Sequence, residues 1–207
     1  MQFHRAIFLA AMATAAMSLP ASAATVASAT TALNIRTGPG PQYSVIGAVP
    51  PGAQVTIAGC IQGSMWCQIA YNGKQGWAYS QYMMATLSGR SLAVAEMRDI
   101  PPVAYQAPVE VVGSAVATPQ VQVTGTLVPR PITAAPIDLT PPPAVQSYVV
   151  SHPMAPVYLN GEVVEGAALP DTVAIAGVPG FDYDYAYVNS VPVLVEPSTR
   201  QVLYVYR

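Results

Sequence analysis

The chain has 207 residues, of which only 9% are charged and 21 are proline, and its formal net charge is −2. So few charges with so many prolines exclude one continuous globular core and indicate small folded units joined by a proline-rich spacer. The balanced charge provides no basic face, so we expect neither nucleic acid nor an anionic membrane as a partner.

The N-terminus has the pattern of an export signal. A short basic start that ends at Arg5 precedes an apolar run over 6–19, and the small residues Ala21 and Ala23 fit cleavage after Ala23. The run is too short to span a membrane comfortably. We predict a cleavable signal peptide at 1–23, a periplasmic or secreted protein, and no transmembrane segment after cleavage.

The next part of the chain predicts a small β-barrel at 24–85. Residues 24–31 are small and without periodicity, which predicts a mobile leader. From 33 to 82, short β-type runs alternate with Gly, Pro and Asn turns about every ten residues. This spacing is typical of an all-β barrel.

Three motifs in this stretch occur in the order of a known family. They are an Asn-hydrophobic-Arg-x-Gly-Pro opening at 34–39, a Gly-x-x-Val-x-hydrophobic middle at 52–57, and Gly76-Trp77 near the end. Over residues 30–84 the chain resembles a bacterial SH3-like (SH3b) domain. The resemblance implies an SH3-like barrel that often recognises cell-wall peptides in a groove beside the first long loop. Because Gly-Trp closes the barrel in that family, we expect Trp77 in the core.

The resemblance also implies a ligand groove of aromatic side chains, which bury much area at small entropic cost, with cations for ligand carboxylates. The candidate residues are Tyr43, Trp66, Tyr71, Tyr79, Tyr82, Arg36 and Lys74. The alternative is that Tyr82 belongs to the core and the other tyrosines are ordinary half-exposed strand residues. The expected partner is a cell-wall peptide, peptidoglycan or an envelope protein.

The two cysteines of the chain, Cys60 and Cys67, predict a disulfide, because exported proteins oxidise such pairs. A two-residue hairpin loop at Gly63-Ser64 would place the two cysteines directly opposite each other. A bulge at Gly59 would keep the apolar residues of both strands on the core face. A zinc site lacks further ligands, and a redox pair lacks the Cys-x-x-Cys spacing.

Residues 86–152 read as a proline-rich linker of low structure. Prolines at this frequency predict neither a helix nor a central strand. Two valine-rich runs, 109–112 and 121–124, are candidates for short strands. As a flexible coil the linker would span about 45 Å and hold the two folded units apart.

Residues 153–207 predict a short C-terminal β-meander. Asn160-Gly161 signals a hairpin, Asn189-Ser190 signals a further tight turn, and Pro192 indicates an edge strand or a bulge. Residues 169–171, 178–180, 187–189 and 194–200 also resemble a module of exported bacterial proteins known as domain of unknown function 1236. That resemblance implies no activity.

The residues that carry chemistry are few. His152 precedes Pro153 in the linker and reads as a solvated loop residue, and Asp182 and Asp184 lack neighbouring ligands and read as a solvated acidic loop. We therefore predict no catalytic residue, no metal, no cofactor and no enzymatic activity.

The fold class is mainly β, with a barrel, a spacer and a C-terminal β-meander. The function that fits best is an exported, non-enzymatic envelope protein whose SH3-like domain binds a peptidoglycan-type or peptide ligand. The alternative is a structural or assembly protein of the periplasm that uses both β modules for protein–protein contacts. The acidic C-terminal module and the barrel, which has cations without acidic residues, motivate this alternative.

Overall fold

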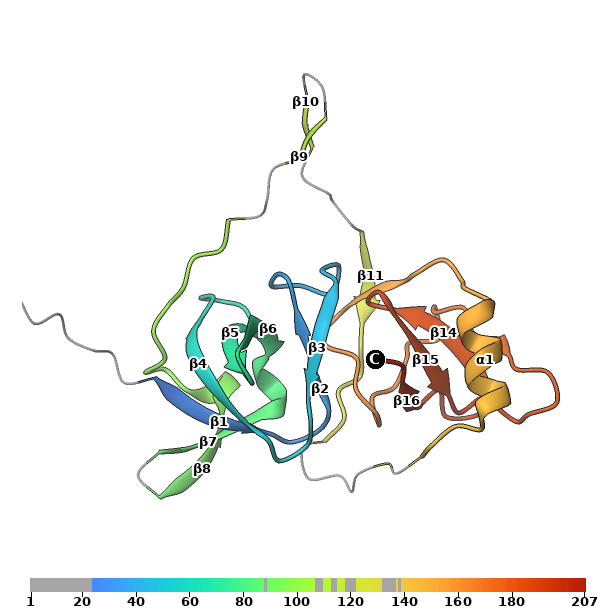
Figure 1. Cartoon of the computed structure of the whole chain (residues 1–207), viewed down its shortest axis with the longest axis horizontal. Helices are drawn as coiled ribbons and strands as arrows, with labels where there is room; N and C mark the ends of the chain where they lie inside the picture. The colour runs from blue at the N-terminus through green and yellow to red at the C-terminus, as the bar shows by residue number, and fades with distance from the viewer. Residues whose placement is uncertain are drawn as a thin grey trace, which may run out of the picture.

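The computed structural model describes residues 24–87, 89–106, 110–112, 115–117, 122–131, 137 and 139–207. The predicted signal peptide lies outside the described residues. The fold is mainly β, as predicted, and consists of a barrel and a C-terminal β module that lie side by side (Figure 1). None of the helices in these ranges is long and apolar enough to cross a membrane.

Eight antiparallel strands of the described chain form the barrel, in the order β3-β2-β6-β5-β4-β1-β7-β8. The elements are β1 (Thr25–Ala29), β2 (Leu33–Arg36), β3 (Val45–Val49), β4 (Gln54–Cys60), β5 (Trp66–Tyr71), β6 (Lys74–Tyr79), η1 (Ser80–Tyr82), β7 (Met83–Leu87), β8 (Arg90–Ala93) and η2 (Val94–Glu96). In β4 every second residue is buried, which is the alternation of a strand with one face on a core. Trp77 is 5% exposed, so its predicted core position is confirmed.

The predicted mobile leader is wrong. Residues Thr25–Ala29 form β1, which lies between β4 and β7 in the sheet. Ala27 and Ala29 are each 2% exposed, and both belong to the core of the barrel. An alanine-rich strand shows little hydrophobic alternation, which is why the sequence pattern missed it.

The predicted disulfide is confirmed. Cys60 and Cys67 are bonded and lie opposite each other in the β4–β5 ladder, which shifts register between Ile57 and Gly59 as the expected bulge requires. The turn differs by one residue from the prediction. Ser64 N donates to Ile61 O at 3.2 Å, so Gly63 occupies the left-handed position of that turn, with φ of 72°.

The C-terminal module contains the predicted meander. Its sheet has the order β13-β14-β15-β16, and α1 packs against it. The elements are α1 (Pro143–Ser151), β11 (Val123–Thr126), β12 (Tyr158–Asn160), β13 (Ala176–Gly177), β14 (Asp184–Val188), β15 (Val191–Val195) and β16 (Val202–Val205). Val145 and Val149 of α1 are fully buried with Tyr185 and Leu194 of the sheet.

Two local predictions in this module are corrected. Asn160-Gly161 does not join a hairpin: β12 pairs in parallel with β11, and Glu162 turns into the interior instead of continuing a strand. Of the two alternatives for Pro192, the edge strand is wrong, since β15 lies between β14 and β16, while β15 does have a bulge-type register shift, between Leu194 and Val195. The carbonyl of Pro192 accepts a hydrogen bond from Tyr206 N at 3.0 Å, beyond the last residue of β16.

The described part of 86–152 contains helix and strand elements that the prediction of a low-structure linker did not include. β8 and η2 continue the barrel, β9 (Glu110–Val112) and β10 (Ala115–Ala117) pair antiparallel, and α1 belongs to the C-terminal module. The helix forms despite its prolines because Pro143 is at its first turn, where the missing N–H has no intrahelical partner to lose. The two modules pack against each other and are not held apart.

Candidate functional site

A polar hollow on the barrel contains two of the predicted ligand residues. It has a volume of about 290 Å³ and is lined by Ile35, Gly47, Ala48, Tyr71, Asn72 and Lys74. The tight turn between β5 and β6 positions it, with φ of 47° at Asn72 and 74° at Gly73. This is the left-handed pair that the predicted Asn-Gly turn requires. Tyr71 and Lys74 thus come together at the two ends of one turn.

The hollow presents a positive charge beside a half-buried aromatic ring. Lys74 Nζ donates to Ile46 O at 2.7 Å. Within the described part of the chain this is its one hydrogen bond, and an ammonium has three donors, so two remain for a ligand. A Cβ at Gly47 would approach Nζ to 3.0 Å, and glycine therefore leaves room for the lysine side chain. The arrangement suits a small carboxylate next to an apolar group.

Three aromatic residues of the predicted groove are buried instead. Trp66 is 5% exposed, Tyr79 is 8% exposed and Tyr82 is 2% exposed. Burial raises the pKa of Tyr79, and raises the pKa of Tyr82 to about 12. The rings of Trp66 and Tyr79 meet edge to face with centroids 5.3 Å apart. A barrel of this size uses these rings as core, so they leave the candidate set.

Tyr43 is half-buried and packs against Tyr105, a residue that the sequence reasoning did not select. The two rings are edge to face, with centroids 5.6 Å apart. Tyr105 makes a second edge-to-face contact with Trp77, at 5.3 Å. The surface beside the first long loop is thus occupied by a side chain of the same protein.

Arg36 was predicted to bind a ligand carboxylate, and its partner is a carboxylate of this chain. Its side chain is fully buried, as is that of Glu162 in the C-terminal module. Arg36 Nε donates to Glu162 Oε2 at 2.6 Å, and Nη2 donates to Oε1 at 2.7 Å. Nη1 donates to the carbonyls of Pro41, Tyr43 and Asn189. A guanidinium with every nitrogen engaged and no exposure cannot serve an external ligand, so this prediction is corrected.

Further polar side chains complete this interface between the modules. Asn34 donates to Glu162 Oε1 at 3.0 Å and accepts from Arg207 Nε at 2.9 Å. Arg207 also donates to Glu165 at 2.7 Å. Asn189 fixes the loop that carries Glu162, because it accepts from Leu159 N and donates to Gly161 O. Asn34 and Arg36 of β2 are therefore both hydrogen-bonded to polar side chains of the C-terminal module.

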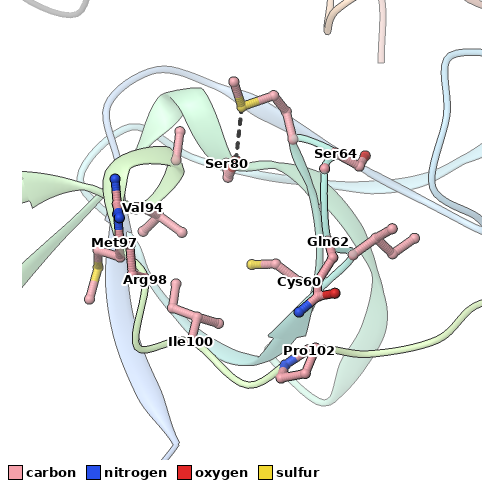
Figure 2. A pocket seen from close by; sticks show the side chains of 13 residues that line it. Cys60, Gln62, Ser64, Ser80, Val94, Met97, Arg98, Ile100 and Pro102 are labelled. Carbon is pink, nitrogen blue, oxygen red and sulfur yellow. Dashed lines mark hydrogen bonds between the residues drawn. The ribbon is translucent and has the colours of Figure 1, made fainter.

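A larger hollow of about 510 Å³ lies beside the disulfide hairpin (Figure 2). Hairpin residues such as Gln62 and Ser64 line one side, with Pro102 beside them, and the segment from η2 to Ile100 lines the other. Its walls are polar and apolar in about equal measure: Val94, Met97 and Ile100 are apolar, while Gln62 and Ser64 are polar and Arg98 adds a cation. None of the described residues that line this hollow was proposed for ligand binding in the sequence analysis.

The titratable residues singled out from the sequence lie apart from one another. Within the described ranges no three His, Cys, Asp or Glu side chains lie close enough to hold a metal ion. His152 is exposed at the end of α1, where its ring stacks on Tyr148 with centroids 4.0 Å apart. Asp182 is exposed, and Asp184 is half-buried on β14.

The fold defines a protein built from a small β-barrel with a second β module docked on it. Family models identify both parts: residues 31–84 match "Bacterial SH3 domain", and residues 148–207 match "Domain of unknown function (DUF1236)". The chain therefore contains a bacterial SH3 domain followed by a DUF1236 domain, and both predicted resemblances are confirmed. Neither description names a catalytic activity.

One curated relative is similar to part of the chain. Over 79 residues the chain is 38% identical to a Bacillus subtilis (strain 168) protein named "Putative N-acetylmuramoyl-L-alanine amidase YrvJ". The match covers 38% of this chain and 14% of the relative. The chain thus spans only a small fraction of that protein's length.

Proposed function

We propose that this protein is an exported, non-enzymatic protein of the cell envelope whose SH3 domain binds a peptidoglycan-type ligand. The bacterial SH3 match supports a binding module. The similarity to a segment of a protein named as an N-acetylmuramoyl-L-alanine amidase supports the cell wall as the target. Because this segment covers 14% of the relative, it supports shared attachment rather than shared catalysis. The signal-peptide pattern and the disulfide support a periplasmic or secreted location.

The observation that carries the proposal is the pairing of Tyr71 and Lys74 in one hollow of the SH3 domain. A peptide carboxylate would accept from Lys74 Nζ, the amide of Asn72 would bond the adjacent peptide group, and the ring of Tyr71 would cover an alkyl side chain. Such a site binds weakly and depends on salt, because Lys74 is exposed.

Retention of the full chain on purified peptidoglycan tests this proposal. We expect Lys74→Met to reduce retention at low salt by about tenfold, since hydrogen bonds to charged groups contribute about 1.5–3 kcal/mol. Arg90→Met is the matched control, because Arg90 is an exposed cation of β8 outside the hollow. Equal retention of the two variants, or no retention of the parent protein, would reject the proposal.

A second candidate function is assembly through protein–protein contacts of both β modules. The buried contact between Arg36 and Glu162 favours it, since one module here already recognises the other. Crosslinking in the intact envelope separates the two functions. Crosslinks to proteins, with wall retention unaffected by Lys74→Met, would favour assembly over wall binding.

A further inference from the structure

An extended segment, Ile100–Tyr105, crosses the barrel beside the disulfide hairpin, and we name it the strap. Cys60 N donates to Pro101 O at 3.0 Å, and Val103 N donates to Cys60 O at 3.0 Å. These two bonds form a parallel bridge between Cys60 and Pro102. The backbone groups of Pro102 point away from β4 in this arrangement, so the missing N–H of proline costs no bond.

The strap adds to an edge that the barrel leaves open. β1 pairs with β4 as far as the Thr25–Ile57 pair, so Gly59 and Cys60 extend past the end of β1. The strap has the two-residue period of a strand: Pro101, Val103 and Tyr105 are half-buried, while the residues between them are exposed. Main-chain bonds with alternate side chains in contact are how sheets bind extended peptides.

The barrel surface has room for these side chains at two glycines. A Cβ on Gly59 would overlap Val103 and would lie 2.6 Å from Pro101 O. A Cβ on Gly38 would lie 2.7 Å from the Tyr105 hydroxyl. Between these points, the ring of Tyr105 rests edge to face on Tyr43 and Trp77. The groove is therefore shaped for an apolar residue followed two positions later by an aromatic residue.

We propose that this groove is a peptide-recognition site and that the strap is its resident ligand. The partner is an extended segment of another protein with the pattern apolar-x-aromatic, aligned like Val103 and Tyr105. This site is separate from the Tyr71 and Lys74 hollow, and the proposal does not depend on wall binding. The strap competes with the partner: if it is docked in nine copies of ten, the apparent affinity of the partner falls about tenfold.

Binding of a labelled synthetic peptide to the full chain tests the proposal. The probe has the sequence of residues 99–106, Asp-Ile-Pro-Pro-Val-Ala-Tyr-Gln, and the readout is fluorescence anisotropy. We expect saturable binding to the Tyr105→Ala variant, and binding to the parent protein that is weaker by about tenfold or more. No binding to the variant, or equal binding to both proteins, would overturn the proposal.

Matched controls distinguish recognition from nonspecific adhesion. A peptide N-methylated at the valine loses the donor to Cys60 O, and a peptide with alanine in place of tyrosine loses the ring contacts; both should lose binding by tenfold or more. Gly59→Ala should exclude the strap and the peptide alike. Unchanged binding in any of these three controls would contradict strand addition in this groove.

A second variant keeps the test decisive. If Tyr105→Ala loses the near-UV circular dichroism of a folded protein, the Val103→Ser variant is used in its place. This substitution removes the apolar side chain at Gly59 and keeps the ring contacts of Tyr105. Failure of both variants to fold would show that the strap is an integral part of the core, which would also overturn the proposal. Retention of the parent protein on purified peptidoglycan is measured in parallel. If the peptide binds to the Tyr105→Ala variant but the parent protein is not retained on peptidoglycan, only the function proposed for the Lys74 hollow is rejected.

Discussion

Arg36 and Glu162 are 126 residues apart in the sequence, and their fully buried side chains form a bidentate ion pair between the SH3 domain and the C-terminal module. Each of the two charges is balanced by the other, and the Glu162 carboxylate also accepts hydrogen bonds from Asn34 and from the backbone N–H of Val163. A buried charge is tolerated only with such partners. The two modules are therefore coupled through a contact that neither can satisfy alone.

Removal of one member of this pair should destabilise the protein strongly. We expect Glu162→Gln to lower the free energy of unfolding by about 3–5 kcal/mol, because it leaves the Arg36 guanidinium buried without a counter-charge. Denaturant unfolding followed by circular dichroism measures the loss. In the double variant Arg36→Met with Glu162→Leu we expect recovery of only part of it: no uncompensated charge remains, but the carbonyls that Arg36 bonds and the N–H of Val163 lose their partners.

Glu165 provides the matched control for this prediction. Its ion pair with Arg207 lies in the same interface but is partly exposed, with side chains 14% and 16% accessible. Glu165→Gln should therefore cost no more than about 1 kcal/mol. If Glu162→Gln and Glu165→Gln lower the free energy of unfolding equally, burial does not make the Arg36–Glu162 pair more important for stability than the partly exposed pair.

Asn189 should be the most sensitive turn residue of the C-terminal module. It is fully buried, has φ of 51°, and makes two side-chain hydrogen bonds that fix the Glu162 loop. Asn189→Ala leaves Leu159 N and Gly161 O unsatisfied, and each such group costs about 1–3 kcal/mol. Thermal unfolding measures the effect.

Asn72 separates the effect of backbone strain from that of lost bonds. It also has a positive φ, of 47°, but it is exposed. Asn72→Ala should cost only the left-handed backbone penalty, about 1–2 kcal/mol. If this variant is destabilised as much as Asn189→Ala, the buried hydrogen bonds of Asn189 are not the reason for its sensitivity.

Local signals in the sequence predicted local structure well. Asn72-Gly73 and Asn189-Ser190 have the left-handed backbone that their turns require, and the hairpin register placed the two cysteines opposite each other. These features depend on neighbours in the chain, so residue type and spacing are enough. The proline clusters misled the reading of 143–151, because proline is excluded from a helix interior but not from its first turn.

Contacts between distant segments were not predictable in the same way. Arg36 was chosen as a carboxylate ligand, and the residue type was right, but nothing near it in the sequence identifies Glu162 as its partner. Tyr105 lies in a proline-rich stretch without a helix or strand signal, so its contact with Trp77 depends on the folded barrel. Strand alternation also does not say which aromatic face is interior, which is why Trp66 on β5 and Tyr79 on β6 were misassigned.

The disulfide should contribute a large part of the stability of the SH3 domain. For the short loop that Cys60 and Cys67 close, the loop-entropy model predicts about 2.5 kcal/mol. The double variant Cys60→Ser, Cys67→Ser should show this loss in denaturant unfolding, and reductant should shift the parent protein but not the variant. A reductant effect on the cysteine-free variant would point to a cause other than the disulfide.

Alkaline pH should destabilise the protein through tyrosines whose pKa is raised in the folded state. Burial raises the pKa of Tyr82 from 10.0 to about 12, and burial together with the contact to Tyr43 raises the pKa of Tyr105 to about 12. Because each folded pKa exceeds the unfolded value, the folded state holds more protons, and this stability is complete below pH 10 and is lost as pH rises towards 12. Tyrosinate absorbance, with unfolding measured at each pH, follows the loss. Tyr82→Phe should flatten the decline over that interval, and an unchanged slope would mean that Tyr82 does not contribute to it.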